Sequence, residues 1–242
     1  MQYHRRKLLL AAAGASLGGL AMIASRTCDA QGRRQGRKKP TPPPPTEEPN
    51  SPPEQLMLEH AVAERLLLIY QEGLRRLRAS EAVSAAAFNQ AAGLLRRVIE
   101  DYHQKHEEDN IFPHFESQAE FAALVKTLRA QHAAGRKLTD TILDSASVEK
   151  FAQPEARKAL VRACEAYLRM ARPHMAQEAT KVLQALYDVL PEEKIDGIGA
   201  LFQQQEKQLF GEDGLDKVLE DIDRLEAELQ IGALDVFTPS DV

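Results

Sequence analysis

The chain has 242 residues, a formal net charge of −5, no tryptophan and 5% aromatic residues, so it suits one or two helix-rich domains rather than a β-sandwich or barrel. Residues 1–40 hold nine basic residues and one acidic residue, which leaves residues 41–242 with a net charge of −13. This acidic body argues against nucleic acid as a partner.

Residues 1–30 have the pattern of an export signal. Basic residues precede an apolar run of 16 residues, 8–23, and small residues before a cleavage point after Ala30 complete the pattern. The run is short for a membrane span, which needs ~20 residues. Adjacent Arg5 and Arg6 resemble a twin-arginine signal, the type that exports folded proteins. We expect an exported, periplasmic protein that meets the membrane only transiently, with an uncleaved anchor as the alternative.

A linker follows at residues 31–53, where proline, glycine and charged residues are concentrated. This composition cannot bury a core and predicts a solvated polyproline-type spacer.

Residues 54–190 predict four long helices. Apolar and small residues recur at alternating steps of four and three from Leu56, Phe88, Phe121 and Leu160. We expect an all-α, up-down-up-down four-helix bundle, in which Pro173 kinks the fourth helix. Residues 191–242 predict a C-terminal extension with two accessory helices outside the bundle, at about 192–209 and 213–230.

Each of the four helices carries one histidine within its apolar stripe, and two of them carry a glutamate four residues later. The six residues are His60, His103, Glu107, His132, His174 and Glu178. Residues four apart point to the same side of a helix. With a rise of ~1.5 Å per residue, all four histidines fall in the same half of the bundle. Because buried carboxylates are costly without a cation, this pattern predicts a metal site.

The donor atoms are nitrogen and carboxylate oxygen, which favour iron or manganese over zinc. Six ligands are too many for one metal that keeps an open position. Two metals share them naturally, with Glu107 and Glu178 as bridges and the histidines as terminal ligands. The Glu-x-x-His motif of ferritin-like di-iron bundles fits only once, at Glu100 and His103.

Four stretches resemble hemerythrin-like (HHE cation-binding) proteins: LMLEH at 56–60, DYHQKHEEDNIFPHF at 101–115, LRAQHAAGR at 128–136 and RPHMAQE at 172–178. The resemblance implies two non-haem iron ions joined by carboxylates and an oxo bridge. It assigns the four histidines as terminal ligands and the two glutamates as bridges. It also implies a small ligand such as O2, nitric oxide or peroxide, or the handling of iron itself.

The chain departs from the O2-carrying members at two positions. They place a second histidine four residues after the first on the third helix, where this chain has Arg136, and an aspartate where it has Glu178. An iron with one ligand fewer is more open to chemistry. We therefore expect an exported di-iron protein for binding, sensing or storage, and sensing would need a partner protein. The alternative is an enzyme that detoxifies peroxide or nitric oxide.

Several neighbouring residues have roles that the sequence leaves open. Glu64 and Glu108 are either further ligands or outer contacts, while His106 and His114 are expected at the surface or at a helix end. Three tyrosines either pack in the core or donate hydrogen bonds to bound oxygen: Tyr70, Tyr102 and Tyr167. Cys164 is expected to be a small buried residue.

Overall fold

The computed structural model describes residues 51–239, and this part of the chain contains helices and loops but no strand. The predicted all-α fold class is therefore confirmed. The predicted export signal at residues 1–30 and nearly all of the linker lie outside the described residues, as do residues 240–242. Those assignments stay predictions.

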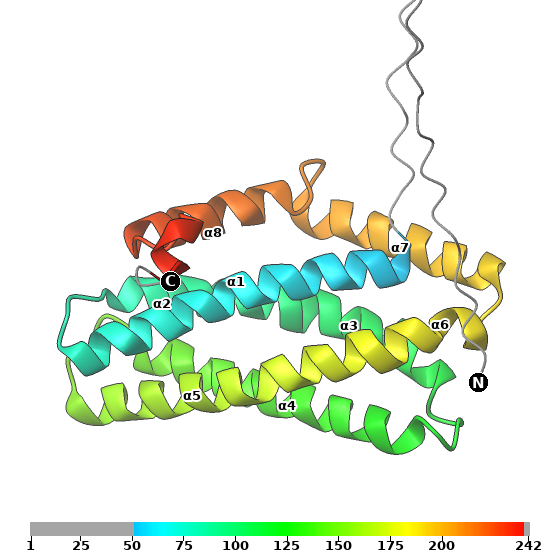
Figure 1. Ribbon diagram of the computed structural model, residues 1–242, viewed down its shortest axis with the longest axis horizontal. Coiled ribbons are helices and arrows are strands. Elements are labelled where there is room, and N and C mark those ends of the chain that lie inside the picture. The colour runs from blue at the N-terminus through cyan, green and yellow to red at the C-terminus, as the bar shows by residue number, and fades with distance from the viewer. Residues whose placement is uncertain (1–50, 240–242) are drawn as a thin grey trace, which may run out of the picture. The chain divides into compact units, whose positions relative to one another are not determined.

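Four long helical segments form the main body (Figure 1). The first is α1 (Pro52–Ala79), and the third is α4 (Ala122–Ser145). The second and fourth change helix type along their length. The second comprises α2 (Ala85–Leu94), η1 (Leu95–His103), α3 (Gln104–His106) and η2 (Glu107–Ile111), followed by a 3-10 turn, η3 (Phe112–His114). The fourth comprises α5 (Pro154–Gln177), η4 (Glu178–Val182) and α6 (Leu183–Val189).

Local sequence signals set the helix starts. The Glu54 carboxylate accepts a hydrogen bond from the Ser51 backbone N–H at 2.9 Å, which closes a capping box before α1. The Ser84 hydroxyl accepts from the Ala87 N–H at 3.1 Å and caps α2. Pro154 opens α5 at a position where its missing N–H costs nothing. Pro173 lies inside α5, as expected from the sequence.

The four segments pack around a shared interior, because α1 contacts both α2 and α5, and α4 contacts the same two helices. The interior has two apolar layers. One is built around residues such as Leu67, Leu95 and Cys164, and the other around Leu56 and Phe112. All six predicted metal ligands are buried polar residues, and in each helical segment they lie in sequence between residues of the two apolar layers. Apolar side chains therefore pack on both sides of them.

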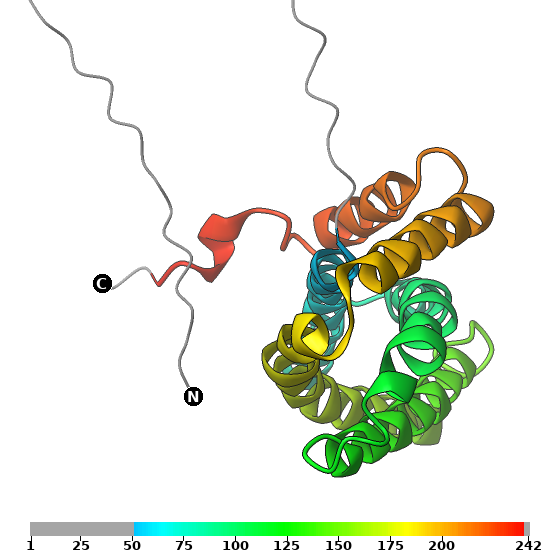
Figure 2. The same cartoon turned by 90° about the vertical axis from the view of Figure 1, so that its right-hand side faces the viewer.

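Two further helices, α7 (Glu192–Phe210) and α8 (Asp216–Glu228), pack outside the bundle against α1, and α8 also contacts α2. Figure 2 shows both on one flank of the bundle. Arg65 anchors α8, because its guanidinium donates to Glu226 at 2.9 Å and to Asp223 at 2.5 Å. The docking of α8 leaves the Arg65 side chain 32% exposed.

A short 3-10 segment, η5 (Leu234–Phe237), ends the described chain. Within residues 51–239, no helix is both long enough and apolar enough to cross a bilayer.

Candidate metal centre

The structure brings the predicted ligands together. One ligand atom from each of four buried residues lies within 4.8 Å of the others: His60, His103, Glu107 and Glu178. His132 and His174 adjoin this group, and their Nε2 atoms are 3.2 Å apart. The six residues come from all four helical segments of the bundle.

Each carboxylate lies between two histidines from different helices. Glu107 directs Oε1 to His103 Nε2 at 3.0 Å and Oε2 to His132 Nε2 at 3.5 Å. Glu178 places Oε2 3.4 Å from Nε2 of both His60 and His174. The histidines form two close pairs, with ring centroids 4.8 Å apart for His60 and His103 and 4.9 Å apart for His132 and His174. The two carboxylates therefore connect the two histidine pairs.

Several of the polar atoms that face one another at this site have no aligned hydrogen bond within residues 51–239. Both oxygens of Glu107, both oxygens of Glu178 and Nε2 of His60 are buried without an aligned hydrogen bond. Buried polar atoms normally have partners, and buried carboxylates are costly unless a cation compensates them. The residues thus fit a cation with nitrogen and oxygen ligands.

Three of the histidines are oriented from behind. His103 Nδ1 lies 2.7 Å from Glu59, His132 Nδ1 lies 2.8 Å from Glu108, and His174 Nδ1 lies 2.9 Å from Gln131. A carboxylate or amide oxygen only accepts, so each Nδ1–H donates and each Nε2 lone pair faces the centre. Such outer hydrogen bonds are the usual way in which a metal-binding histidine is fixed. The sequence analysis missed Glu59 and Gln131.

The two acidic residues left open by the sequence have outer positions. Glu108 accepts from His132 and from Arg136, whose guanidinium lies 2.9 Å from the carboxylate. Burial raises the pKa of Glu108, but these two hydrogen bonds outweigh it and lower the pKa to about 2. Glu64 pairs with Arg172 at 3.2 Å near the surface. Neither residue belongs to the group of facing ligand atoms.

Burial and charge shift the pKa values of the central groups. Burial raises the pKa of Glu107 to about 8, and the charge of Glu178 adds to the effect. Burial lowers the pKa of His103, but the carboxylates of Glu107 and Glu59 outweigh it and hold the pKa well above its usual value. Burial lowers the pKa of His132 to about 4. These groups share a site in which their charges depend on one another.

The π-helical segments coincide with the ligands. His103 ends η1, Glu107 begins η2 and Glu178 begins η4. Their backbone carries the wider hydrogen-bonding pattern, since the Leu183 N–H bonds to the Glu178 carbonyl and the Phe112 N–H to the Glu107 carbonyl. Short π segments inside α-helices are frequent at functional sites. The sequence analysis assumed regular helices and missed this feature.

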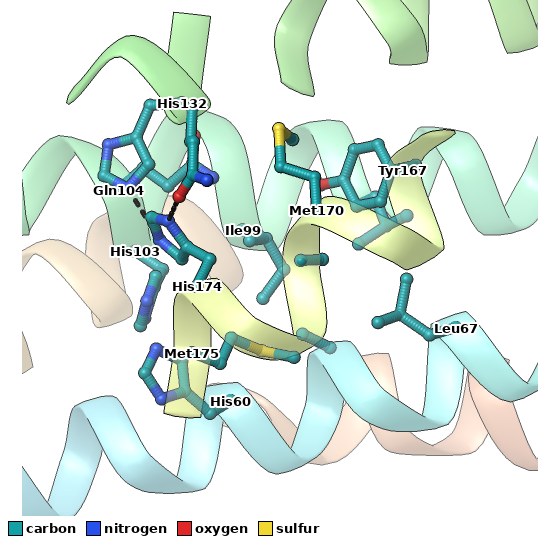
Figure 3. A pocket seen from close by; sticks show the side chains of 14 residues that line it. His60, Leu67, Ile99, His103, Gln104, His132, Tyr167, Met170, His174 and Met175 are labelled. Carbon is teal, nitrogen blue, oxygen red and sulfur yellow. Dashed lines mark hydrogen bonds between the residues drawn. The ribbon is translucent and has the colours of Figure 1, made fainter. Parts of the chain in front are cut away.

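A cavity of about 30 Å³ adjoins the histidines. One water needs roughly 10–15 Å³ of such a cavity, so the space holds about two or three waters. Figure 3 shows the four histidines gathered at one end of the pocket and Leu67, Tyr167 and Met170 at the other. Its walls are mostly apolar, which suits a small uncharged ligand.

Other buried polar residues lie away from the facing ligand atoms. Glu100 accepts from Thr139 at 2.6 Å and pairs with Arg96 at 2.9 Å, so the lone Glu-x-x-His match does not bring Glu100 into the centre. Cys164 is buried, as expected, and burial raises the pKa of its thiol. Tyr70 is fully buried, and its hydroxyl has no hydrogen-bond partner among the described residues.

His106 was expected at the surface or at a helix end, and the structure corrects the first of these alternatives. It is buried, its ring centroid lies 3.9 Å from that of Phe202 in α7, and burial lowers its pKa to about 4. The surface expectation was wrong because α7 covers this side of the second helix.

The described part of the chain is thus all-helical, with a buried group of histidines and carboxylates that could hold a cation. The sequence model described as the Hemerythrin HHE cation binding domain matches residues 51–186, and the chain belongs to this family. The chain is also 38% identical over 236 residues to uncharacterized proteins of Mycobacterium tuberculosis, Rv1995, and Mycobacterium bovis, Mb2018. Each match covers 98% of this chain and 91% of the relative. No solved structure matches the chain.

Proposed function

We propose that the protein holds two iron ions, one beside each histidine pair, with Glu107 and Glu178 as bridging ligands. The observation that carries this proposal is the orientation of Glu107, whose two oxygens face histidines of different pairs. A single cation would leave one of these pairs unused. Nitrogen and carboxylate ligands suit iron or manganese more than zinc.

The chain's own residues would prepare the centre in three ways. Glu59, Glu108 and Gln131 hold the imidazoles so that each Nε2 faces inward. The two apolar layers exclude bulk water from both sides. The adjoining cavity admits only small molecules. Iron bound here would supply redox chemistry toward O2, nitric oxide or peroxide.

Elemental analysis of protein purified without chelators tests the proposal directly. We expect about two irons per chain, with near-ultraviolet absorption typical of a bridged ferric pair. Glu107→Gln should lose at least one of the two irons, whereas Glu64→Gln, the same change at a surface carboxylate paired with Arg172, should keep both. Zinc or no metal in the wild-type protein would contradict the proposal.

Between binding and catalysis, we favour binding, sensing or storage, with peroxide or nitric oxide detoxification as the second candidate. The small cavity beside the histidines is the observation that keeps catalysis in view, since it admits a reactant next to the centre. Stopped-flow mixing of reduced protein with peroxide or nitric oxide separates the two. A single turnover would exclude the enzyme, and repeated turnover would establish it.

We also propose that the bundle has the up-down-up-down order of its family and that the protein acts outside the cytoplasm. The second proposal rests on the basic and apolar pattern of residues 1–30 and on adjacent Arg5 and Arg6. Replacing both arginines by lysine should retain the protein in the cytoplasm in a fractionation experiment. Continued export of this variant would count against a twin-arginine signal.

A further inference from the structure

Helix α7 lies beyond residues 51–186, the part of the chain that matches the family. The match to the mycobacterial relatives nevertheless covers 98% of the chain, so it includes most of the C-terminal extension. A segment retained at this length calls for a role. Its residues Phe202 and Phe210 contact the rings of His106 and Tyr102 on the second helix.

A series of buried polar contacts runs from α7 toward the metal centre. The Gln55 side-chain amide donates to Glu206 of α7 at 3.1 Å and to the Tyr102 hydroxyl at 2.8 Å. The Tyr102 hydroxyl lies 3.4 Å from the carbonyl of Phe202, also in α7. Gln55 and Tyr102 are 5% and 1% exposed, whereas Glu206 is half-buried.

A second hydrogen bond between the same two helices orients a proposed ligand. Glu59 uses Oε2 to accept from His103 Nδ1 at 2.7 Å. Gln55 lies one turn before Glu59 on α1, and Tyr102 directly precedes His103. The Gln55–Tyr102 and Glu59–His103 hydrogen bonds are therefore neighbouring contacts between these helices. Because Gln55 donates to the Tyr102 oxygen, the phenolic hydrogen is free to point to the Phe202 carbonyl of α7.

We propose that α7 is a positioning element of the metal centre, in which Glu206 and Phe202 hold the contact between Gln55 and Tyr102 and thereby keep the neighbouring Glu59–His103 hydrogen bond in place. The proposal rests on the proposed function, since fixing His103 matters only if it binds a metal. Ring contacts support the same placement. Tyr102 meets Phe210 of α7 edge to face at 5.2 Å, and Phe202 covers His106. Among the described residues, these contacts with α7 lie beside His103, which belongs to the His60–His103 pair.

The test reads the imidazole of His103 in the metal-free full-length protein. In histidine-labelled protein, NMR should show a downfield Nδ1 proton that exchanges slowly with water and is missing in His103→Gln. Gln55→Leu and Glu206→Leu should each speed its exchange at least tenfold. Glu206→Gln should behave like wild type, because an amide oxygen still accepts from Gln55.

Two matched controls use the same glutamine-to-leucine change. Gln131→Leu should alter His174 and leave His103 unchanged, since Gln131 orients only the other pair. Gln204→Leu, on the exposed face of α7, should alter neither histidine. With Fe(II) added, Gln55→Leu should bind one iron about tenfold more weakly, at the lower end of the 10–100-fold range for outer contacts of metal ligands.

If the His103 Nδ1 proton of folded Glu206→Leu protein exchanges with water as slowly as in wild type, the proposal is overturned. This variant also provides the test if Gln55→Leu does not fold. Because the exchange measurement needs no metal, it stands apart from the iron analysis. Wild-type protein without iron would end the proposed function while leaving the link from α7 to His103 measurable.

Discussion

Glu108 shows how a single side chain outside the ligand group can set the properties of the centre. Its carboxylate joins His132 to Arg136, the residue that stands where O2-carrying relatives have a further histidine. At that position this chain has an ion pair outside the group of facing ligand atoms. This arrangement keeps the His132 Nε2 lone pair directed at the centre without adding a donor atom to it.

Replacing Glu108 by alanine should weaken metal binding about 10–100-fold, the usual cost of losing an outer partner of a metal-binding histidine. The cause is the loss of the acceptor that fixes His132 Nδ1–H. Competition with a chelator of known affinity measures the change. Glu64→Ala is the matched control, since Glu64 pairs only with Arg172 in the described structure. Equal affinities for the two variants would contradict the role of Glu108.

The pKa of Glu107 predicts how the metal-free protein responds to pH. Its value of about 8 lies above the usual 4.5, so the folded state binds this proton more tightly than the unfolded state does. Stability is then greatest at low pH and is lost as the pH rises toward 8, by about 1.4 kcal/mol per pH unit for one proton. The raised pKa of His103 acts in the same direction.

Below pH 6.5 the lowered pKa of His132 opposes this trend, because that group favours the unfolded state when it is protonated. The clean window is therefore pH 6.5 to 8. Denaturant unfolding of metal-free protein should show a decrease in the free energy of unfolding across this window, and Glu107→Gln should reduce it. A free energy that rises with pH would show that other groups dominate.

Among the elements, α1 and α2 approach each other closely at a glycine. A Cβ atom added at Gly73 would lie 2.5 Å from the Phe88 ring, whereas at Gly93 of α2 nothing lies within 4 Å. Gly73→Ala should lower the free energy of unfolding by about 1–3 kcal/mol through overpacking. Gly93→Ala should raise it by up to about 1 kcal/mol through helix propensity. Denaturant unfolding measures both, and a stabilising Gly73→Ala would contradict the packing described here.

The helices and the convergence of the ligands follow from periodicity, but the outer contacts do not. Steps of three and four residues place His103 and Glu107 on one face whichever way the helices cross. Glu59 is different, because it reaches a histidine on another helix and only the crossing geometry brings the two together. The burial of His106 likewise depends on α7, whose docking has no signal in the second helix.

The π segments could not be read from the sequence for a related reason. A π-helical turn is stabilised by what it gains in tertiary contacts, not by a strong local preference of its residues. In η4, Glu178 starts the segment and Val182, which is fully buried in the second apolar layer, ends it. The wider turn allows Glu178 to face the other predicted ligands while Val182 packs in the apolar layer.

For the whole molecule, we expect the proposed cation to stabilise the folded state by compensating the buried carboxylates. Metal that binds only the folded state adds RT ln(1 + [L]/Kd), about 4 kcal/mol at a thousandfold excess over Kd. For a domain of this size, 1 kcal/mol shifts Tm by roughly 2–4 °C, so loading should raise Tm by about 8–16 °C. Without a cation, the buried oxygens of Glu107 and Glu178 have no aligned hydrogen-bond partner within residues 51–239.

Calorimetry of metal-free and iron-loaded protein at one pH measures this difference. Glu178→Gln is the informative control, because it removes a buried charge as well as one proposed bridging ligand. It should reduce the gain in Tm on adding iron. Burial raises the pKa of Glu178, but interactions with the imidazoles of His174 and His60 outweigh it and hold the pKa below its usual value. The folded state therefore favours the charged carboxylate, and Glu178→Gln should lower the Tm of the metal-free protein. Equal melting of wild-type protein with and without iron would mean that the centre does not bind iron in the folded state.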